Sequence, residues 1–417
     1  MKALRRARPL STCAGKRRGY CGVAVGHAPA PEGRATGGRN KLARIGGRGR
    51  NVWHIGGMST RATGVVTLGV VIAVAACAHA QTQFFTDPLS GAEFSWIGAI
   101  NNPAYGGPDP FNIGVTGRGS VGYEYSIGRF EVTTAQWVEF YNAVLARPDA
   151  ISFPTQTFWT PTIWGAIRDT SYTGPGTRYR VNPNVANAAM LPVGGISWRT
   201  AAVYCNWLHN NKATDANAFL SGAYDVSTFS GGFPTFTDQA SRSPGARYWI
   251  PSWDEWMKAA HYDPNRPNAD GSTGGWWTYP HMSDLAPTYG PPAGFPGGSA
   301  ANQANSGFNT PDDVEHRIPL GAYANVQSPW GLFDVAGGTA EWTETIYTLQ
   351  GRMSRNTPGS ARGEDAASAI FDVGSNQPQL PFSRQGLRIA TSIPSPGTSL
   401  VLALLTCMSG LRRRRTS

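Results

Sequence analysis

The chain has 417 residues, enough for one large domain or two ordinary ones, and its formal net charge is +10. The positive charge is concentrated at the two ends: residues 1–57 hold 13 Lys and Arg against one acidic residue, and Arg412–Arg415 add four more. Residues 81–411 hold 18 basic and 25 acidic residues. The body is therefore mildly acidic, and we expect it to bind no nucleic acid.

The N-terminal part predicts export. Residues 1–57 are rich in Arg and Gly and lack periodicity, which is typical either of a disordered basic arm or of a misassigned start that should fall at Met58. Residues 58–80 combine a short basic region, an apolar run over 64–76 and an Ala-His-Ala cleavage pattern, and so predict a signal peptide. The run is too short for a membrane span of roughly 20 residues. A lipoprotein anchored at Cys77 is the alternative.

The body, residues 81–392, carries 13 of the 14 Trp and most of the Pro and Gly, but few charged residues and no long periodic helix. This composition predicts one compact α+β domain with short elements and little regular secondary structure. Cys205 is its one cysteine, so no disulfide can form within it.

The first elements of the body are two strands and a helix. Residues 94–98 and 123–131 alternate in the manner of strands. Thr133-x-x-Gln136 is a capping box, and apolar residues follow it at helical spacing, which predicts a helix over 133–144. Residues 146–190 are polar, with Pro and aromatic residues, and we expect them to form long loops.

Two further helices are expected. Ser197 is a suitable N-cap for the second helix, and Ser252-x-x-Glu255 forms a capping box for the third. One face of the second helix carries Ala201, Tyr204, Cys205 and Leu208. Cys205 is therefore interpreted as a small buried apolar residue and not as a nucleophile. Residues 276–280 are expected to form a buried turn, and 290–298 a Pro/Gly loop.

The stretch Ser328-Pro-Trp-Gly-Leu-Phe-Asp-Val-Ala-Gly-Gly-Thr-Ala-Glu-Trp342 places three glycines among large apolar residues. Glycines allow positive φ and close backbone approach, so we expect a tight loop against the core. A carboxylate at Glu341 in such a place caps amides, pairs with a cation or holds a metal.

Four blocks of the chain resemble the formylglycine-generating enzyme family, also called the sulfatase-modifying factor family. Residues 127–137 resemble its E-V-T-N-x-x-Y/F block, and 192–207 its P-V-x-x-V-S-W-x-x-A-x-x-Y-C-x-W block. Residues 247–260 resemble R-L-P-T-E-A-E-W-E-x-A-A, and 331–342 resemble G-L-x-D-M-x-G-N-V-x-E-W. The resemblance covers residues 92–391. It implies one domain of the formylglycine-generating-enzyme type, which has a C-type-lectin-like fold.

The resemblance also implies a structural Ca²⁺, because in that family the Asn-containing turn and the Glu of the last block hold one. Here Glu341 matches, but Gly338 stands where the family has Asn, so one side-chain ligand is missing. Asn305 and Asp313 lie where the family has its other ligands, and oxygen ligands on loops suit calcium. Purely local hydrogen bonding of these turn residues is the alternative.

The family's chemistry requires a pair of copper-binding cysteines between the E-W signature and a terminal G-F-R. Gly386-Leu-Arg388 matches the G-F-R, but no Cys lies between Cys205 and Cys407. Thiolates hold copper(I), so copper is not expected here. The sequence favours a non-catalytic domain that binds a glycan or a peptide through aromatic loops (146–190, 276–298, 351–384) or has a structural role. An active oxidoreductase that modifies a sulfatase or another protein is the alternative.

The C-terminal segment, residues 393–417, combines a Pro-rich motif, an apolar run over 399–411 and an Arg cluster. It resembles the PEP-CTERM sorting tail, although Ser395 stands where that tail has Glu. This implies recognition by an exosortase-like enzyme, transient membrane contact through 399–411, and a place at the cell surface, outer envelope or extracellular matrix of a Gram-negative-type bacterium. A weak membrane anchor is the alternative.

Overall fold

The computed structural model describes residues 84–110, 112–147, 165–232, 235–305, 317–348, 351–355, 373–376 and 385–392. The expectations for residues 1–57, 58–80 and 393–417 therefore lie outside the described residues. In the described parts of the chain, no helix is long and apolar enough to span a membrane.

The larger sheet has five antiparallel strands in the order β1-β2-β3-β13-β6. Its strands are β1 (Phe84–Thr86), β2 (Glu93–Ile97), β3 (Tyr125–Gly128), β6 (Tyr248–Trp249) and β13 (Ala390–Thr391). The last strand, β13, lies between β3 and β6, so the beginning and the end of the described chain are paired in one sheet.

The second sheet has four strands in the order β11-β10-β9-β12. They are β9 (Ala340–Thr348), β10 (Gly351–Arg355), β11 (Val373–Asn376) and β12 (Gln385–Gly386). The pairing of β12 with β9 is parallel, with Gly386 opposite Glu341. Two hairpins complete the strands: β4 (Ala166–Arg168) with β5 (Tyr179–Val181), and β7 (Tyr262–Pro267) with β8 (Thr273–Trp276).

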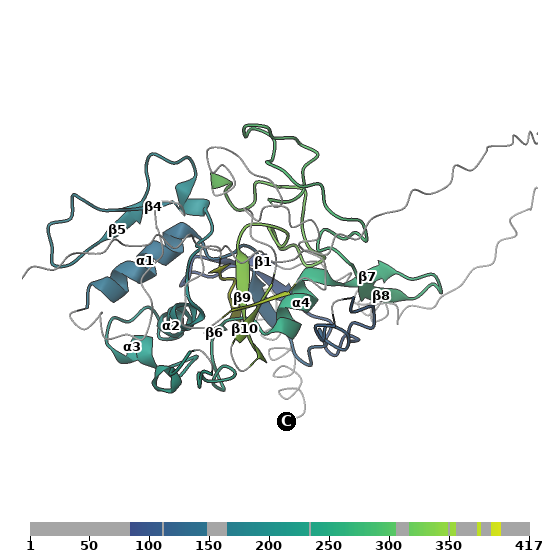
Figure 1. Ribbon diagram of the computed structural model, residues 1–417, viewed down its shortest axis with the longest axis horizontal. Helices are drawn as coiled ribbons and strands as arrows, with labels where there is room; N and C mark the ends of the chain where they lie inside the picture. The colour runs from purple at the N-terminus through teal and green to yellow at the C-terminus, as the bar shows by residue number, and fades with distance from the viewer. Residues whose placement is uncertain are drawn as a thin grey trace, which may run out of the picture. The chain divides into compact units, whose positions relative to one another are not determined.

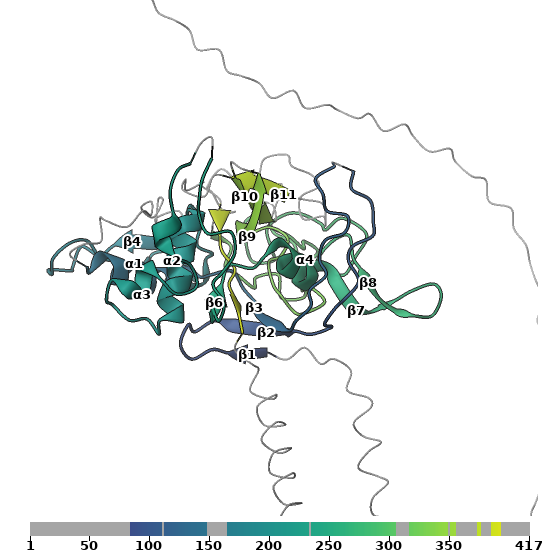
Figure 2. The same cartoon turned by 90° about the horizontal axis from the view of Figure 1, so that it is seen from below.

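The helices are short. In the described residues they are α1 (Thr134–Leu145), α2 (Trp198–His209), α3 (Asn217–Leu220) and α4 (Trp253–His261), with the 3₁₀ turns η2 (Ala188–Met190) and η3 (Val226–Thr228). In both views α1, α2 and α3 gather on one side of the sheets, whereas α4 and the β7–β8 hairpin lie on the other (Figures 1 and 2). The α+β class with little regular structure is thus confirmed.

Each of the three predicted helices begins where its cap predicts. Thr133 and Gln136 bond reciprocally at the start of α1, Ser252 and Glu255 do so at α4, and the Ser197 side chain accepts the Thr200 amide at α2. These contacts satisfy amides that have no partner within the helix.

Aromatic packing between α1 and α2 forms much of the core. The rings of Trp137, Phe140, Tyr204 and Trp207 lie with neighbouring centroids 5.0–6.2 Å apart. Cys205 is fully buried beside them, as expected. Each large apolar side chain that is fully buried contributes about 1.5–3 kcal/mol to folding, so this contact fixes α1 on α2.

Three expectations from the sequence were wrong in part. Residues 146–190 include the β4–β5 hairpin and η2, not loops alone. The strand expected over 123–131 is limited to β3, and beyond it the Val132 amide donates to the Leu387 carbonyl, outside the β2–β3 pairing. Residues 276–280 are not a fully buried turn, since Trp276 belongs to β8.

Candidate functional site

A buried ion pair links the Gly-rich turn to the end of the domain. Glu341 on β9 and Arg388 are both fully buried. The Arg388 guanidinium donates to the Glu341 carboxylate through Nε at 3.0 Å and Nη2 at 2.9 Å, and Trp256 Nε1 donates to the same carboxylate at 2.7 Å. Arg388 also donates to the carbonyls of Gly128 and Phe333, both at 2.9 Å. The pairing of β12 with β9 sets this geometry, because it brings the strand before Arg388 alongside Glu341.

Glu131 fills the space beside Gly338. Its carboxylate accepts the Thr339 amide and hydroxyl, both at 3.0 Å. Gly338 has φ +75°, and a Cβ added there would lie 2.6 Å from Glu131 Oε1. Burial raises the pKa of Glu131 well above its ordinary value, and the neighbouring Glu341 raises it further, whereas Arg388 partly offsets the rise. Glu131 thus takes up the space that a side chain at position 338 would need.

The predicted calcium ligands are brought together only in part. Asn305 is buried and its backbone bridges Gly337, so it does lie at the Gly-rich turn. Asp313 lies outside the described residues. Both oxygens of Glu341 accept hydrogen bonds from Arg388 or Trp256, which does not fit a calcium site of six to eight oxygens. Among the described residues, no three His, Cys, Asp or Glu gather in a way that could hold a metal. A Ca²⁺ near Asn305 and Asp313 stays a prediction.

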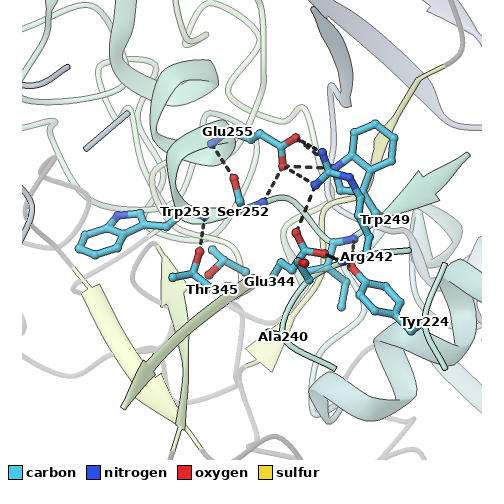
Figure 3. A network of polar contacts seen from close by, with 12 residues as sticks. Tyr224, Ala240, Arg242, Trp249, Ser252, Trp253, Glu255, Glu344 and Thr345 are labelled. Atoms are coloured by element: carbon cyan, nitrogen blue, oxygen red, sulfur yellow. Dashed lines mark hydrogen bonds and ion pairs between the residues drawn. The ribbon is translucent and has the colours of Figure 1, made fainter. Parts of the chain in front are cut away.

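A second polar cluster, which we call the Arg242 cluster, joins α4 to β9 (Figure 3). Arg242 donates to Glu255 through Nη2 at 2.9 Å and to Glu344 through Nη1 at 3.1 Å. The guanidinium also lies 4.1 Å from the ring centre of Trp249. Tyr123 closes the cluster, because its hydroxyl donates to Glu255 at 2.7 Å and accepts from Arg242 at 2.9 Å. One arginine therefore holds two carboxylates and orients a tyrosine.

Glu255 has two roles in this cluster. It caps α4 as predicted, since Oε2 accepts the Ser252 amide at 2.7 Å. It also accepts from Arg242, a contact that the sequence analysis missed together with Glu344. The only signal in the sequence is an acidic residue on the buried strand that follows the Glu341-Trp342 pair.

Burial gives Glu344 unusual acid–base properties. Desolvation raises the pKa of Glu344 to about 7; Arg242 opposes this rise and the nearby Glu255 adds to it. The carboxylate also accepts the Tyr224 hydroxyl at 3.2 Å and the Arg242 amide. Glu344 therefore ionises less readily than an exposed glutamate, and it lies at the wall of a groove.

The groove beside the Arg242 cluster has a volume of about 590 Å³. Its lining combines polar and charged residues with two aromatic rings, a Pro–Gly turn and an alanine: Tyr123, Glu124, Ser241, Arg242, Ser243, Pro244, Gly245, Ala246, Trp249, Ser252, Glu344 and Ser392. Tyr123 is 44% exposed, whereas Trp249 is buried. Such a groove is suited to binding a polar ligand, since aromatic faces and convergent polar groups are what binding sites combine.

The other candidates from the sequence, Cys205 and the aromatic loops, provide less evidence for a functional site. Cys205 is the one cysteine among the described residues, and burial raises the pKa of its thiol well above the ordinary value, so it is held as a thiol within the core. Of the loops expected to bind a ligand, 148–164, 356–372 and 377–384 lie outside the described residues. The Trp276 indole donates to the Pro103 carbonyl and the Trp277 indole to the Asp263 carboxylate on β7, so both indole N–H groups are engaged within the domain.

The chain is similar to one protein family and to several solved structures. The family of Sulfatase-modifying factor enzyme 1-like domains matches residues 118–393. No curated protein matches the chain. Similar solved structures include Treponema denticola variable protein 1 (TM-score 0.41, 16% identity, 74% of this chain and 99% of that chain) and PvdO from Pseudomonas aeruginosa (0.40, 14%, 75% and 99%). CarF is a third (0.38, 18%, 65% and 87%). The family match confirms the fold expected from the four sequence blocks.

Proposed function

Because this chain belongs to the family of Sulfatase-modifying factor enzyme 1-like domains, we propose that it is an exported, surface-associated and non-catalytic member that binds a glycan or a peptide. The observation that carries the proposal is the groove beside the Arg242 cluster, in a chain without the cysteines that copper chemistry needs.

The cysteine content supports the non-catalytic part of the proposal. Soft thiolates are the ligands that retain copper(I), and the chain has no Cys between Cys205 and Cys407. Cys205 lies on α2 in the hydrophobic core. No step through copper is therefore assigned to this domain.

The ends of the chain support the proposal for localisation. A signal peptide at 58–80 would direct export, and a sorting tail at 393–417 would make an exosortase-like enzyme the partner of the chain. Residues 399–411 would contact the membrane transiently. These features suggest a place on the cell surface, in the outer envelope or in the extracellular matrix.

A mass-spectrometric assay tests the non-catalytic part. The full chain is incubated with copper and a C-x-P-x-R peptide, beside an active formylglycine-generating enzyme. We expect the peptide to keep its thiol with this chain and to lose it with the active enzyme. Conversion of the Cys to formylglycine by this chain would overturn the proposal and favour the oxidoreductase alternative.

An array of glycans and peptides tests the binding part with the same full chain. We expect a ligand whose binding weakens when Tyr123 is replaced by Ala. If the folded chain binds nothing on the array, the binding proposal is wrong and the structural role remains.

A further inference from the structure

The end of β13 marks the place where the chain continues into residues 393–417. Strand β13 lies between β3 and β6 and is antiparallel to both. Ser392, the residue after β13, is exposed and lines the groove beside the Arg242 cluster, which we call the Arg242 groove. Tyr123 and Ala246, which precede β3 and β6, line the same groove. The C-terminal segment therefore begins at the face of the domain that carries this groove.

Only a short segment joins this face to the apolar run described above as the membrane contact. Residues 393–398 separate Ser392 from the run over 399–411. An extended chain spans at most about 3.3–3.6 Å per residue, so Ser392 stays within about 25 Å of the membrane when that run is inserted. A compact domain of about 300 residues is roughly 50 Å across. The segment is therefore too short for the opposite face of the domain to turn towards the lipid.

Two large apolar side chains are exposed close to the end of β13. Ile100 is 50% exposed and Tyr123 is 44% exposed. They lie on neighbouring segments, because the Asn101 amide donates to the Val121 carbonyl at 2.9 Å. Exposed apolar side chains that gather in one place are more informative about a binding surface than scattered ones. This end of the domain thus offers apolar surface where the C-terminal segment holds it near lipid.

Tyr123 can be covered by lipid without losing a hydrogen bond. Its hydroxyl accepts from Arg242 at 2.9 Å and donates to Glu255 at 2.7 Å, both within the domain. A polar group that is buried without a partner costs free energy, but this hydroxyl keeps its partners when the ring is covered. Tyrosine is also enriched at the interface between membrane and water. The ring is therefore suited to an interfacial position.

The charged groups around the groove balance one another. Arg242 pairs with both Glu255 and Glu344. Together with their neighbours these residues make three cations and three carboxylates: Arg242, Lys258, Arg352, Glu124, Glu255 and Glu344. Anionic headgroups therefore neither attract nor repel this face strongly, and its contact with lipid depends on the apolar side chains.

We propose that the face carrying Ile100 and Tyr123 rests on the lipid surface while residues 399–411 are inserted in the membrane. This inference rests on the membrane tail of the proposed function, and it adds a lipid bilayer as the partner of this face. Insertion of the tail supplies the proximity, and the two side chains then enter the interfacial region of the bilayer. Release of the tail removes that proximity, so the contact ends with it.

Lipid cross-linking of the unaltered full chain is the first test. The chain is bound to vesicles of phosphatidylethanolamine and phosphatidylglycerol that contain a phospholipid with a photoactivatable group near its headgroup, and labelled peptides are identified by mass spectrometry. We expect labels in the peptides that contain Ile100 and Tyr123. Met190 is the control, since it is 37% exposed but lies beside Ile389, at the opposite end of β13. Equal labelling of Met190, or a vesicle-bound chain without labels at Ile100 and Tyr123, would overturn the inference.

Substitutions then measure the contribution of this face. Ile100→Asp should weaken partition of the full chain into these vesicles about tenfold, because it removes an apolar side chain and adds a charge that anionic headgroups repel. Met190→Asp adds the same charge at the opposite end of β13 and should stay within about threefold of the unaltered chain. Both positions are exposed, so the fold tolerates either change. Equal weakening by the two variants would show that net charge, and not this face, governs binding.

Ile100 also separates this inference from the ligand-binding proposal. It is not among the residues that line the Arg242 groove, so Ile100→Asp should leave binding on the glycan and peptide array unchanged. A chain that binds an array ligand but is not labelled by lipid keeps the binding function, and only this inference is wrong. A full chain that does not bind vesicles contradicts the membrane tail, and the inference is wrong with it. Cross-links from Tyr123 to a second copy of the chain, in place of lipid, would make this face a contact between protein molecules.

Discussion

At the scale of single residues, the most consequential contact is the one between Glu341 and Arg388. Both side chains are fully buried, and Arg388 alone ties the β9 carboxylate to the carbonyls of Gly128 and Phe333. Removal of one partner from a buried ion pair leaves a charge without compensation, which typically costs about 3–5 kcal/mol. We therefore expect Glu341→Gln to lower the free energy of unfolding by about that amount.

The calcium dependence of this loss separates two roles for Glu341. Denaturant unfolding of the unaltered chain and of Glu341→Gln would be compared in EDTA and in millimolar calcium. Because Arg388 is the partner seen here, the loss should be the same in both. A loss that appears only in calcium would show instead that Glu341 is a calcium ligand.

Substitution of Gly338 tests why this turn has Gly at the position where the family motif that it resembles has Asn. Asn tolerates positive φ, so the conformation itself does not forbid Gly338→Asn. The obstacle is Glu131, whose Oε1 would lie 2.6 Å from the new Cβ. We expect Gly338→Asn to cost about 1–3 kcal/mol, as overpacked cores do.

A double-mutant cycle checks the cause of that loss. In a Glu131→Ala background the same Gly338→Asn substitution should cost much less, because the obstructing carboxylate has gone. If the two costs simply add, the clash with Glu131 is not the reason for glycine at this position.

The raised pKa of Glu344 predicts that the stability difference between the unaltered chain and Glu344→Gln depends on pH. Its pKa is raised from 4.5 to about 7, so its stabilising contribution is fully present below pH 4.5 and is lost as pH rises through 7. Glu344→Gln cannot ionise and escapes this loss. Between pH 4.5 and 8 the stability of the variant should therefore gain about 3 kcal/mol relative to the unaltered chain, at 1.36 kcal/mol per pKa unit. Urea unfolding at several pH values measures the gap, and a constant gap would contradict the assignment.

At the scale of elements, local signals predicted the helices better than the strands. The capping boxes at Thr133 and Ser252 bond to backbone within three residues, so their information is local. A strand such as β13 has two ladder residues and depends on partners far away in the chain. The Arg242 cluster was missed for the same reason, because Arg242 and Glu344 are 102 positions apart.

The cap of α1 allows a direct test of this local information. The Thr133 side chain accepts the Gln136 amide at 3.3 Å. Thr133→Ala should lower the free energy of unfolding by about 1 kcal/mol, whereas Thr133→Ser, which keeps the hydroxyl, should cost much less. Equal losses in thermal or urea unfolding would mean that packing of the methyl group, and not the cap, is what matters.

At the scale of the whole molecule, the pairing of β13 with β3 and β6 makes the last described residues essential to the domain. Residues 385–392 supply β12, β13 and Arg388, so they contribute a strand to each sheet and the arginine that pairs with Glu341. A chain that ends at residue 384 should therefore not fold cooperatively. A chain that ends at residue 392 keeps these contacts and should unfold with the same midpoint as the full chain.

In cells, the chain that ends at residue 392 should also be released from the surface if residues 393–417 are the sorting tail. Surface retention of a folded chain that ends at residue 392 would show that the attachment lies within the domain itself.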